Sequence, residues 1–126
     1  MGCRVHHVHH VARDPQAAAE FYIKHFGGRL FTPQMEYMKA PYVSVMLAGV
    51  EVRIRGVRPN ESGNDRQVDI GLHHFGIQVD DLDSFAAGLE REGVEFTKKP
   101  GPGVLGSKTA FIKAPDGVLI ELVEEH

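Results

Sequence analysis

The spacing of apolar residues along the chain switches from every second position to every third or fourth and back, and this series occurs twice. Alternation predicts a β-strand, and the longer spacing predicts a helix with one apolar face that packs on a sheet. For the first half we predict strand Val5–Ala12, a helix beginning at Asp14-Pro15 and stopped by Gly27-Gly28, strand Arg29–Thr32, a loop over Pro33–Pro41, and strands Tyr42–Leu47 and Val50–Arg55.

The second half shows the same order of elements. There we predict strand Leu72–Val79, a helix from Asp81 to Gly93, strand Val94–Thr97, a loop over Pro100–Gly106, and strands Lys108–Lys113 and Val118–Val123. Each half is then β-α-β-β-β, and neither is large enough to bury both faces of its sheet alone. We therefore predict an α+β fold in which two βαβββ modules share one core and form an open, cupped mixed sheet with the helices on the outside.

A single domain covering residues 1–126 is expected from the length and the apolar content of the chain. Within it the two modules span about residues 4–56 and about residues 70–125. The stretch between them, at about residues 57–69, is rich in Pro, Asn, Ser, Gly and charged residues. This composition is typical of a linker between the modules.

Two His-His pairs occupy equivalent places in the two halves. His7 and His74 are the second members of these pairs, and an Asp follows each of them by seven residues, at Asp14 and Asp81. The offset between the copies is 67 positions for both residue types. A self-match at a fixed offset predicts that the two modules present one imidazole each from equivalent strands.

A carboxylate stands on the last strand of the second module. Side chains alternate between the two faces of a strand, so Glu121 points away from its apolar neighbours, which are expected to pack on the helix. Its counterpart on the matching strand of the first module is Arg53. We predict that His7, His74 and Glu121 converge as a metal site with open positions, suited to Fe, Mn, Zn, Ni or Co.

The remaining histidines divide by the same alternation. His9 shares a face with His7 and is expected either to act as an acid or base in a pocket or simply to line it. His6, His10 and His73 fall on the opposite parity. We predict packing or surface roles for these three.

Charge and composition exclude several classes of function. The net charge of −3 argues against nucleic acid as the main partner, since phosphate binding needs a basic face. No run of apolar residues is long enough for a membrane span, so no membrane partner is expected. The single Cys3 excludes an intrachain disulfide and suits a reducing compartment, so we expect a cytoplasmic protein.

Five segments of the chain have a familiar pattern: His7–Asp14, Ala19–Tyr22 and Phe26–Gly28 in the first half, and His74–Asp83 and Phe111–Leu122 in the second. They resemble the vicinal oxygen chelate superfamily, which includes glyoxalase I, extradiol dioxygenases, methylmalonyl-CoA epimerase, and fosfomycin and bleomycin resistance proteins. The resemblance implies paired βαβββ modules around a divalent metal. It also implies that His7, His74 and Glu121 stand at ligand positions of the family.

Arg53 departs from the family pattern. Glyoxalase I-like and epimerase-like members have Glu or Gln there, whereas an arginine stays protonated and cannot ligate a metal. The resemblance therefore implies a set of two His and one carboxylate, as in the dioxygenase and fosfomycin-resistance branches. Arg53 is expected either to hold a carboxylate or phosphonate of the substrate, or to pair with Glu51, Glu121 or another acid.

Our leading hypothesis from the sequence is a divalent-metal-dependent lyase or isomerase that acts on a small, oxygen-rich molecule. Arg53 would clamp the substrate, and Ser44 and His9 would be further polar contacts, with His9 the candidate acid or base. Two alternatives stay open: an Fe(II) extradiol-type dioxygenase, and a metal-free drug-binding protein of the bleomycin-resistance type. A homodimer is expected by analogy with the family.

Overall fold

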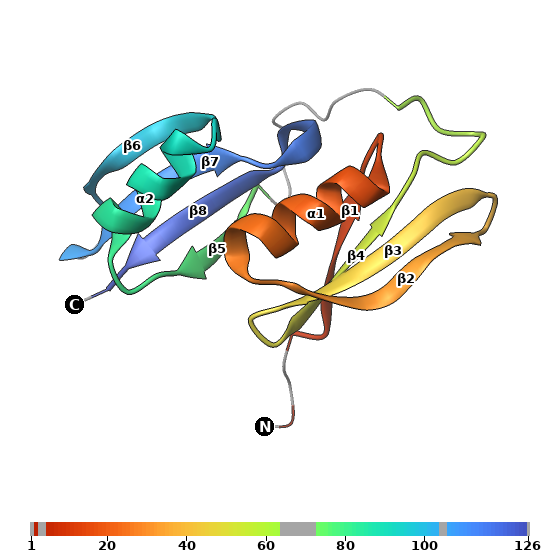
Figure 1. Cartoon of the computed structure of the whole chain (residues 1–126), viewed down its shortest axis with the longest axis horizontal. Coiled ribbons are helices and arrows are strands. Elements are labelled where there is room, and N and C mark those ends of the chain that lie inside the picture. The colour runs from red at the N-terminus through yellow and green to blue at the C-terminus, as the bar shows by residue number, and fades with distance from the viewer. Residues whose placement is uncertain (1, 3–4, 64–72, 104–105, 126) are drawn as a thin grey trace. The chain divides into compact units, whose positions relative to one another are not determined.

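The computed structural model describes residues 2, 5–63, 73–103 and 106–125. The chain divides into two compact units, Met1–Asn64 and Asp65–His126 (Figure 1). Each unit combines one helix with a four-stranded mixed sheet. Within the described residues, neither helix is long and apolar enough to cross a membrane.

In the first unit the order of elements is β1 (His7–Val11), α1 (Pro15–Phe26), β2 (Arg29–Tyr37), β3 (Ala40–Leu47) and β4 (Val50–Arg55). The strands lie in the order β1-β4-β3-β2, with β1 parallel to β4 and the other neighbours antiparallel. The largest fully buried apolar side chains are Tyr22 of α1 and four strand residues, Val43, Val45, Val52 and Ile54. Alternate residues of β3 and β4 therefore form the sheet face that the helix covers.

Helix α1 begins and ends where the sequence predicts. The Asp14 side chain accepts the N–H of Ala17 at 3.1 Å, and Pro15 occupies the first turn. Gly27 ends the helix with φ of 69°, a left-handed conformation that glycine adopts without steric cost. His10 of β1 is buried against this helix, with its Nδ1 3.0 Å from the Tyr22 hydroxyl. The packing role predicted for His10 is confirmed.

The predicted loop over Pro33–Pro41 is wrong. β2 continues to Tyr37, and a two-residue turn at Met38 and Lys39 leads directly into β3. β2 is an edge strand that pairs with β3 through two register shifts, and such a strand tolerates a proline. Met38 and Lys39 both have positive φ, 51° and 63°, which is the backbone of tight hairpin turns usually made by Asn and Gly. The sequence lacks that turn signal, and Tyr37 is a strand residue.

The second unit repeats the topology of the first. Its elements are β5 (Phe75–Gln78), α2 (Leu82–Arg91), β6 (Phe96–Pro102), β7 (Lys108–Lys113), the 3₁₀ turn η2 (Pro115–Gly117) and β8 (Leu119–Glu124). The strands lie in the order β5-β8-β7-β6, with β5 parallel to β8. Neither sheet closes into a barrel. The predicted α+β fold of two βαβββ modules is confirmed.

In the second unit the start of one predicted loop is wrong, and parts of two predicted segments lie outside the described residues. β6 begins at Phe96 and continues to Pro102, so the loop predicted from Pro100 starts too early. Register shifts between β6 and β7 accommodate this proline in another edge strand. The predicted strand start at Leu72 and residues 104–105 of the predicted loop lie outside the described residues.

Candidate functional site

His74 and Glu121 lie in contact in the second unit. His74 stands just before β5, and Gly76 of β5 is the register partner of Glu121 in the parallel strand β8. The Nε2 atom of His74 is 3.3 Å from Oε1 of Glu121, and both side chains are partly exposed. The ring of Phe111 packs edge-on against the imidazole, with centroids 4.9 Å apart. The structure thus brings together two of the three predicted metal donors.

The two His-His pairs have the same local geometry. The Nδ1 atoms of His73 and His74 are 2.9 Å apart, and those of His6 and His7 are also 2.9 Å apart, with nearly perpendicular rings in both pairs. One ring of each pair must donate and the other accept, because one hydrogen bond carries one proton. When His74 donates from Nδ1, its Nε2 carries the lone pair that ligates a metal. His73 is therefore placed to select the tautomer of His74.

His7, the third predicted donor, belongs to the first unit. Its side chain is exposed on β1, and its register partner is Glu51 of β4. Within either unit, the described residues contain no group of three or more His, Cys, Asp or Glu side chains that could hold a metal ion. The imidazole of His74 and the carboxylate of Glu121 are suitable donors for a transition metal, but they are only two. A complete metal site requires at least one further donor.

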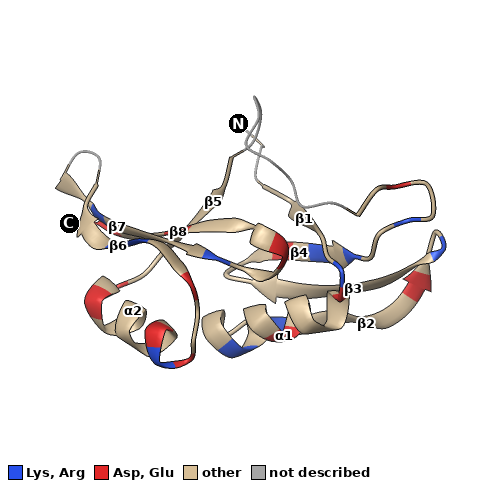
Figure 2. Ribbon diagram, turned by 90° about the horizontal axis from the view of Figure 1, so that it is seen from above, with Lys and Arg blue, Asp and Glu red and all other residues tan. Residues whose placement is uncertain are grey.

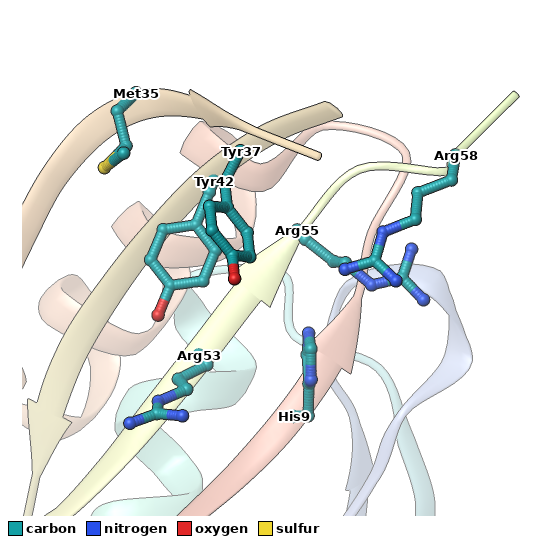
Figure 3. A pocket seen from close by; sticks show the side chains of 7 residues that line it. All are labelled: His9, Met35, Tyr37, Tyr42, Arg53, Arg55 and Arg58. Carbon is teal, nitrogen blue, oxygen red and sulfur yellow. The ribbon is translucent and has the colours of Figure 1, made fainter. Parts of the chain in front are cut away.

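A cavity of about 360 Å³ opens on the face of the first sheet that points away from the buried core (Figure 3). Its walls come from all four strands and from the segment after β4, and the lining residues are His9, Met35, Tyr37, Tyr42, Arg53, Arg55 and Arg58. Strand register explains why they meet: His9 is the partner of Arg53, and Tyr42 is the partner of Arg55. Figure 2 marks the basic residues along β4 in blue. The cavity therefore combines three guanidinium groups with an imidazole and two phenols.

Two of the guanidinium groups have carboxylate partners. Arg53 donates from Nε to Oε1 of Glu51 at 3.0 Å, so the ion pair expected as one alternative for Arg53 is present. Arg55 donates from both terminal nitrogens to the two carboxylate oxygens of Glu61, at 2.7 and 2.9 Å. These hydrogen bonds lower the pKa of Glu61 to about 2. Among the described residues, no acidic side chain pairs with the guanidinium of Arg58.

His9 is held in its neutral form by its surroundings. Partial burial lowers the pKa of His9, and the positive charge of Arg55 and of other nearby basic groups lowers it further. A neutral imidazole has one nitrogen that accepts a proton or hydrogen bond and one that donates. His9 therefore presents both functions to the cavity near neutral pH.

Ser44 and Glu51 are buried beside Arg53. Ser44 is the register partner of Arg53 in the antiparallel neighbour β3, and its side chain is fully buried. Burial raises the pKa of Glu51, but the hydroxyl of Ser44 and the guanidinium of Arg53 lower it by more, so the pKa lies below its ordinary value. Ser44 Oγ is itself buried without a hydrogen-bond partner among the described residues. Its expected contact with a substrate stays a prediction.

A family model described as the Glyoxalase/Bleomycin resistance protein/Dioxygenase superfamily matches residues 4–122. The chain belongs to this superfamily. It is 28% identical to a lactoylglutathione lyase of Arabidopsis thaliana over 94% of this chain and 43% of that protein. It is 38% identical to a probable lactoylglutathione lyase of Vibrio cholerae over 55% of this chain and 46% of that protein. The match spans less than half the length of these curated relatives.

Solved structures of the glyoxalase superfamily share the fold. A glyoxalase family protein from Enterococcus faecalis superposes with a TM-score of 0.80 at 23% identity, covering 98% of both chains. A fosfomycin resistance protein from Listeria monocytogenes superposes with a TM-score of 0.75 at 19% identity, covering 100% of this chain and 96% of that one. These comparisons support the architecture of the glyoxalase superfamily for this chain.

Four cavity residues of this glyoxalase-superfamily chain are not singled out by the sequence: Met35, Tyr37, Tyr42 and Arg58. Tyr42 has a usable signal, because it alternates with a buried valine and opposes Arg55 across the hairpin. Met35 and Tyr37 fall in the segment predicted as a loop, where side chains cannot be assigned to one face of a strand. Arg58 falls in the predicted linker, whose composition carries no periodic signal.

Proposed function

We propose that this chain is a divalent-metal-dependent lyase or isomerase of the glyoxalase type, acting on a small, oxygen-rich, anionic molecule. His7, His74 and Glu121 would hold the metal. The observation that carries the proposal is the 3.3 Å contact between His74 Nε2 and Glu121 Oε1. Its support is the repeated topology of the first unit, which offers His7 at the position equivalent to His74.

The roles of the side chains follow from their places in the fold. A metal bound to these donors supplies Lewis acidity to the oxygen atoms of the substrate. Arg53 uses only its Nε for Glu51, so its terminal nitrogens are available for an anionic substrate group. Because position 53 holds no carboxylate to serve as a base, His9 is the candidate base: among the residues that line the cavity it has a neutral imidazole, whereas the others are a thioether, two phenols and three arginines. Its neutral ring nitrogen would accept and return the transferred proton.

Metal content tests the ligand assignment. Protein purified without chelators is expected to carry about one divalent metal per chain, whereas His74→Ala and Glu121→Gln are expected to lose nearly all of it. Glu95→Gln is the matched control, because Glu95 is an exposed acid of the second unit paired only with Lys113. Equal metal content in the parent and in His74→Ala would refute the assignment.

Turnover tests the reaction class. Lactoylglutathione, the compound in the names of the relatives, is the first substrate to assay. We expect the metal-loaded parent protein to turn it over and the His74→Ala variant to leave it unchanged. Oxygen uptake with catechols would instead establish the dioxygenase alternative and overturn a lyase or isomerase. Ligand binding that EDTA leaves unchanged, with no turnover of any such compound, would favour the metal-free binding protein.

A further inference from the structure

We propose that the cavity of the first unit is a binding site for an oxyanion, a carboxylate or a phosphate, held by Arg58 and Arg53, with an aromatic or apolar group of the same ligand against Tyr37 and Tyr42. None of the predicted metal ligands lines this cavity. The identification of this ligand as the substrate rests on the proposed function, whereas its binding needs no metal.

The charges of the cavity do not cancel. Three arginines line it, but the acids that contact them are two, Glu51 on Arg53 and Glu61 on Arg55. Glu61 engages both terminal nitrogens of Arg55, so that guanidinium is committed to holding the segment after β4. Among the described residues no acid forms an ion pair with the guanidinium of Arg58, although the carboxylate of Glu61 lies near enough to interact with its charge. An anionic ligand would supply the missing counter-charge.

Arg58 is also short of hydrogen-bond acceptors. Its Nε is buried and has no partner among the described residues. A buried donor without an acceptor costs free energy comparable to a lost hydrogen bond, so such a group usually finds a partner in the protein, in ordered water or in a ligand. Arg53 has two terminal nitrogens in addition to the Nε that Glu51 occupies. Each of the two guanidinium groups offers donors that match the planar or tetrahedral geometry of an oxyanion.

The opposite wall selects the rest of the ligand. The rings of Tyr37 and Tyr42 lie 5.9 Å apart between centroids, tilted by 62°, and Met35 lines the cavity as well. Figure 3 shows the two tyrosines on one side of His9 and the guanidinium groups of Arg55 and Arg58 on the other. The volume of about 360 Å³ is that of a small-molecule site. The cavity therefore suits a small ligand with one charged end and one flat or apolar end.

Calorimetric titration of the EDTA-treated full chain with phenyl phosphate, benzoate and inorganic phosphate tests this proposal. We expect phenyl phosphate or benzoate to bind the parent more tightly than inorganic phosphate, and the stronger of the two identifies the anion class. Arg58→Gln and Arg53→Gln should each weaken binding about tenfold or more. Arg29→Gln, an exposed arginine of β2 outside the cavity, should bind like the parent.

The aromatic wall has its own test. Tyr37→Ala removes a half-exposed ring and is expected to weaken phenyl phosphate several-fold while leaving inorganic phosphate unchanged. Absence of binding to the parent, or equal binding by the parent and Arg58→Gln, would overturn the proposal. Metal content is measured separately on the same preparations, so a failed metal assignment leaves this result intact, and a failed anion site leaves the metal result intact.

Discussion

The two units share one scaffold but carry opposite charge at the same place. In the first unit His9 of β1 is the register partner of Arg53, and in the second Gly76 of β5 is the register partner of Glu121. His9 and Gly76 are 67 positions apart, like the two copies of the repeat, so Arg53 and Glu121 occupy equivalent sites. At these two pairs of equivalent positions the first unit has an imidazole and a guanidinium, whereas the second has a glycine and a carboxylate.

The scaffold itself is the common part. Asp14 and Asp81 cap the two helices with nearly the same backbone angles, −127° and 93° against −133° and 96°, and each accepts an N–H from three residues ahead. Both sheets have the same strand order. The comparison teaches that the buried face of each unit preserves the fold, while the opposite face is free to differ in chemistry. The predictions below compare substitutions on the buried face of each sheet with substitutions on the opposite face.

The largest effects are expected in the buried layer. Ile54 and Leu122 hold equivalent positions on β4 and β8, and both are 0% exposed. Replacing either by alanine leaves a cavity in its core and should lower the free energy of unfolding by about 2–5 kcal/mol. Urea denaturation of both variants measures this. A loss below about 1 kcal/mol for one variant would contradict the claim that the two equivalent positions stabilise their units alike.

Smaller losses of stability are expected for substitutions of the equivalent residues Arg53 and Glu121. Arg53→Gln leaves the buried carboxylate of Glu51 without its ion pair and should cost about 1–3 kcal/mol of stability. Glu121→Gln disrupts a contact between two partly exposed side chains and should cost less than about 1 kcal/mol. Urea midpoints compare the two variants. Equal losses of stability in the two variants would mean that Arg53 stabilises the first unit no more than Glu121 stabilises the second.

The smallest effect concerns acid stability of the segment after β4. The pKa of Glu61 is about 2 in the folded chain, below its ordinary value, because Arg55 donates to both of its oxygens. A lowered pKa means that the ion pair stabilises the fold above the ordinary carboxyl range and that this contribution is lost as pH falls toward 2. Glu61→Gln should flatten the dependence of the unfolding midpoint on pH over that window. An unchanged profile would show that Glu61 does not stabilise the folded unit.

The sequence predicts the scaffold well because its signals are local. The helix caps at Asp14 and Asp81, the stop at Gly27 and the alternation around Glu121 each depend on neighbours within a few residues. The repeat then relates the two halves, and it correctly places Arg53 at the site equivalent to Glu121.

The parts that sequence reasoning misses depend on tertiary context. Pro33 reads as a strand breaker, yet it is tolerated because β2 is an edge strand. The turn after it uses Met38 and Lys39 in a conformation that their side chains do not favour. Arg58 lies in a segment with linker composition, and the ion pair of Arg55 with Glu61 and the hydrogen bond from Arg13 to the carbonyl of Gly63 tie this segment to the first unit. Such non-local pairings leave no periodic pattern in the chain.

The central proposal is that His74 and Glu121, with His7, bind a metal and that Arg58 and Arg53 bind an anion. It is tested most directly by titrating two variants, His74→Ala and Arg58→Gln, each with a divalent metal and with phenyl phosphate. We expect His74→Ala to lose the metal and keep the anion, and Arg58→Gln to keep the metal and lose the anion. If either variant loses both ligands while staying folded, or keeps both, the assignment of metal and anion to separate sets of residues is contradicted.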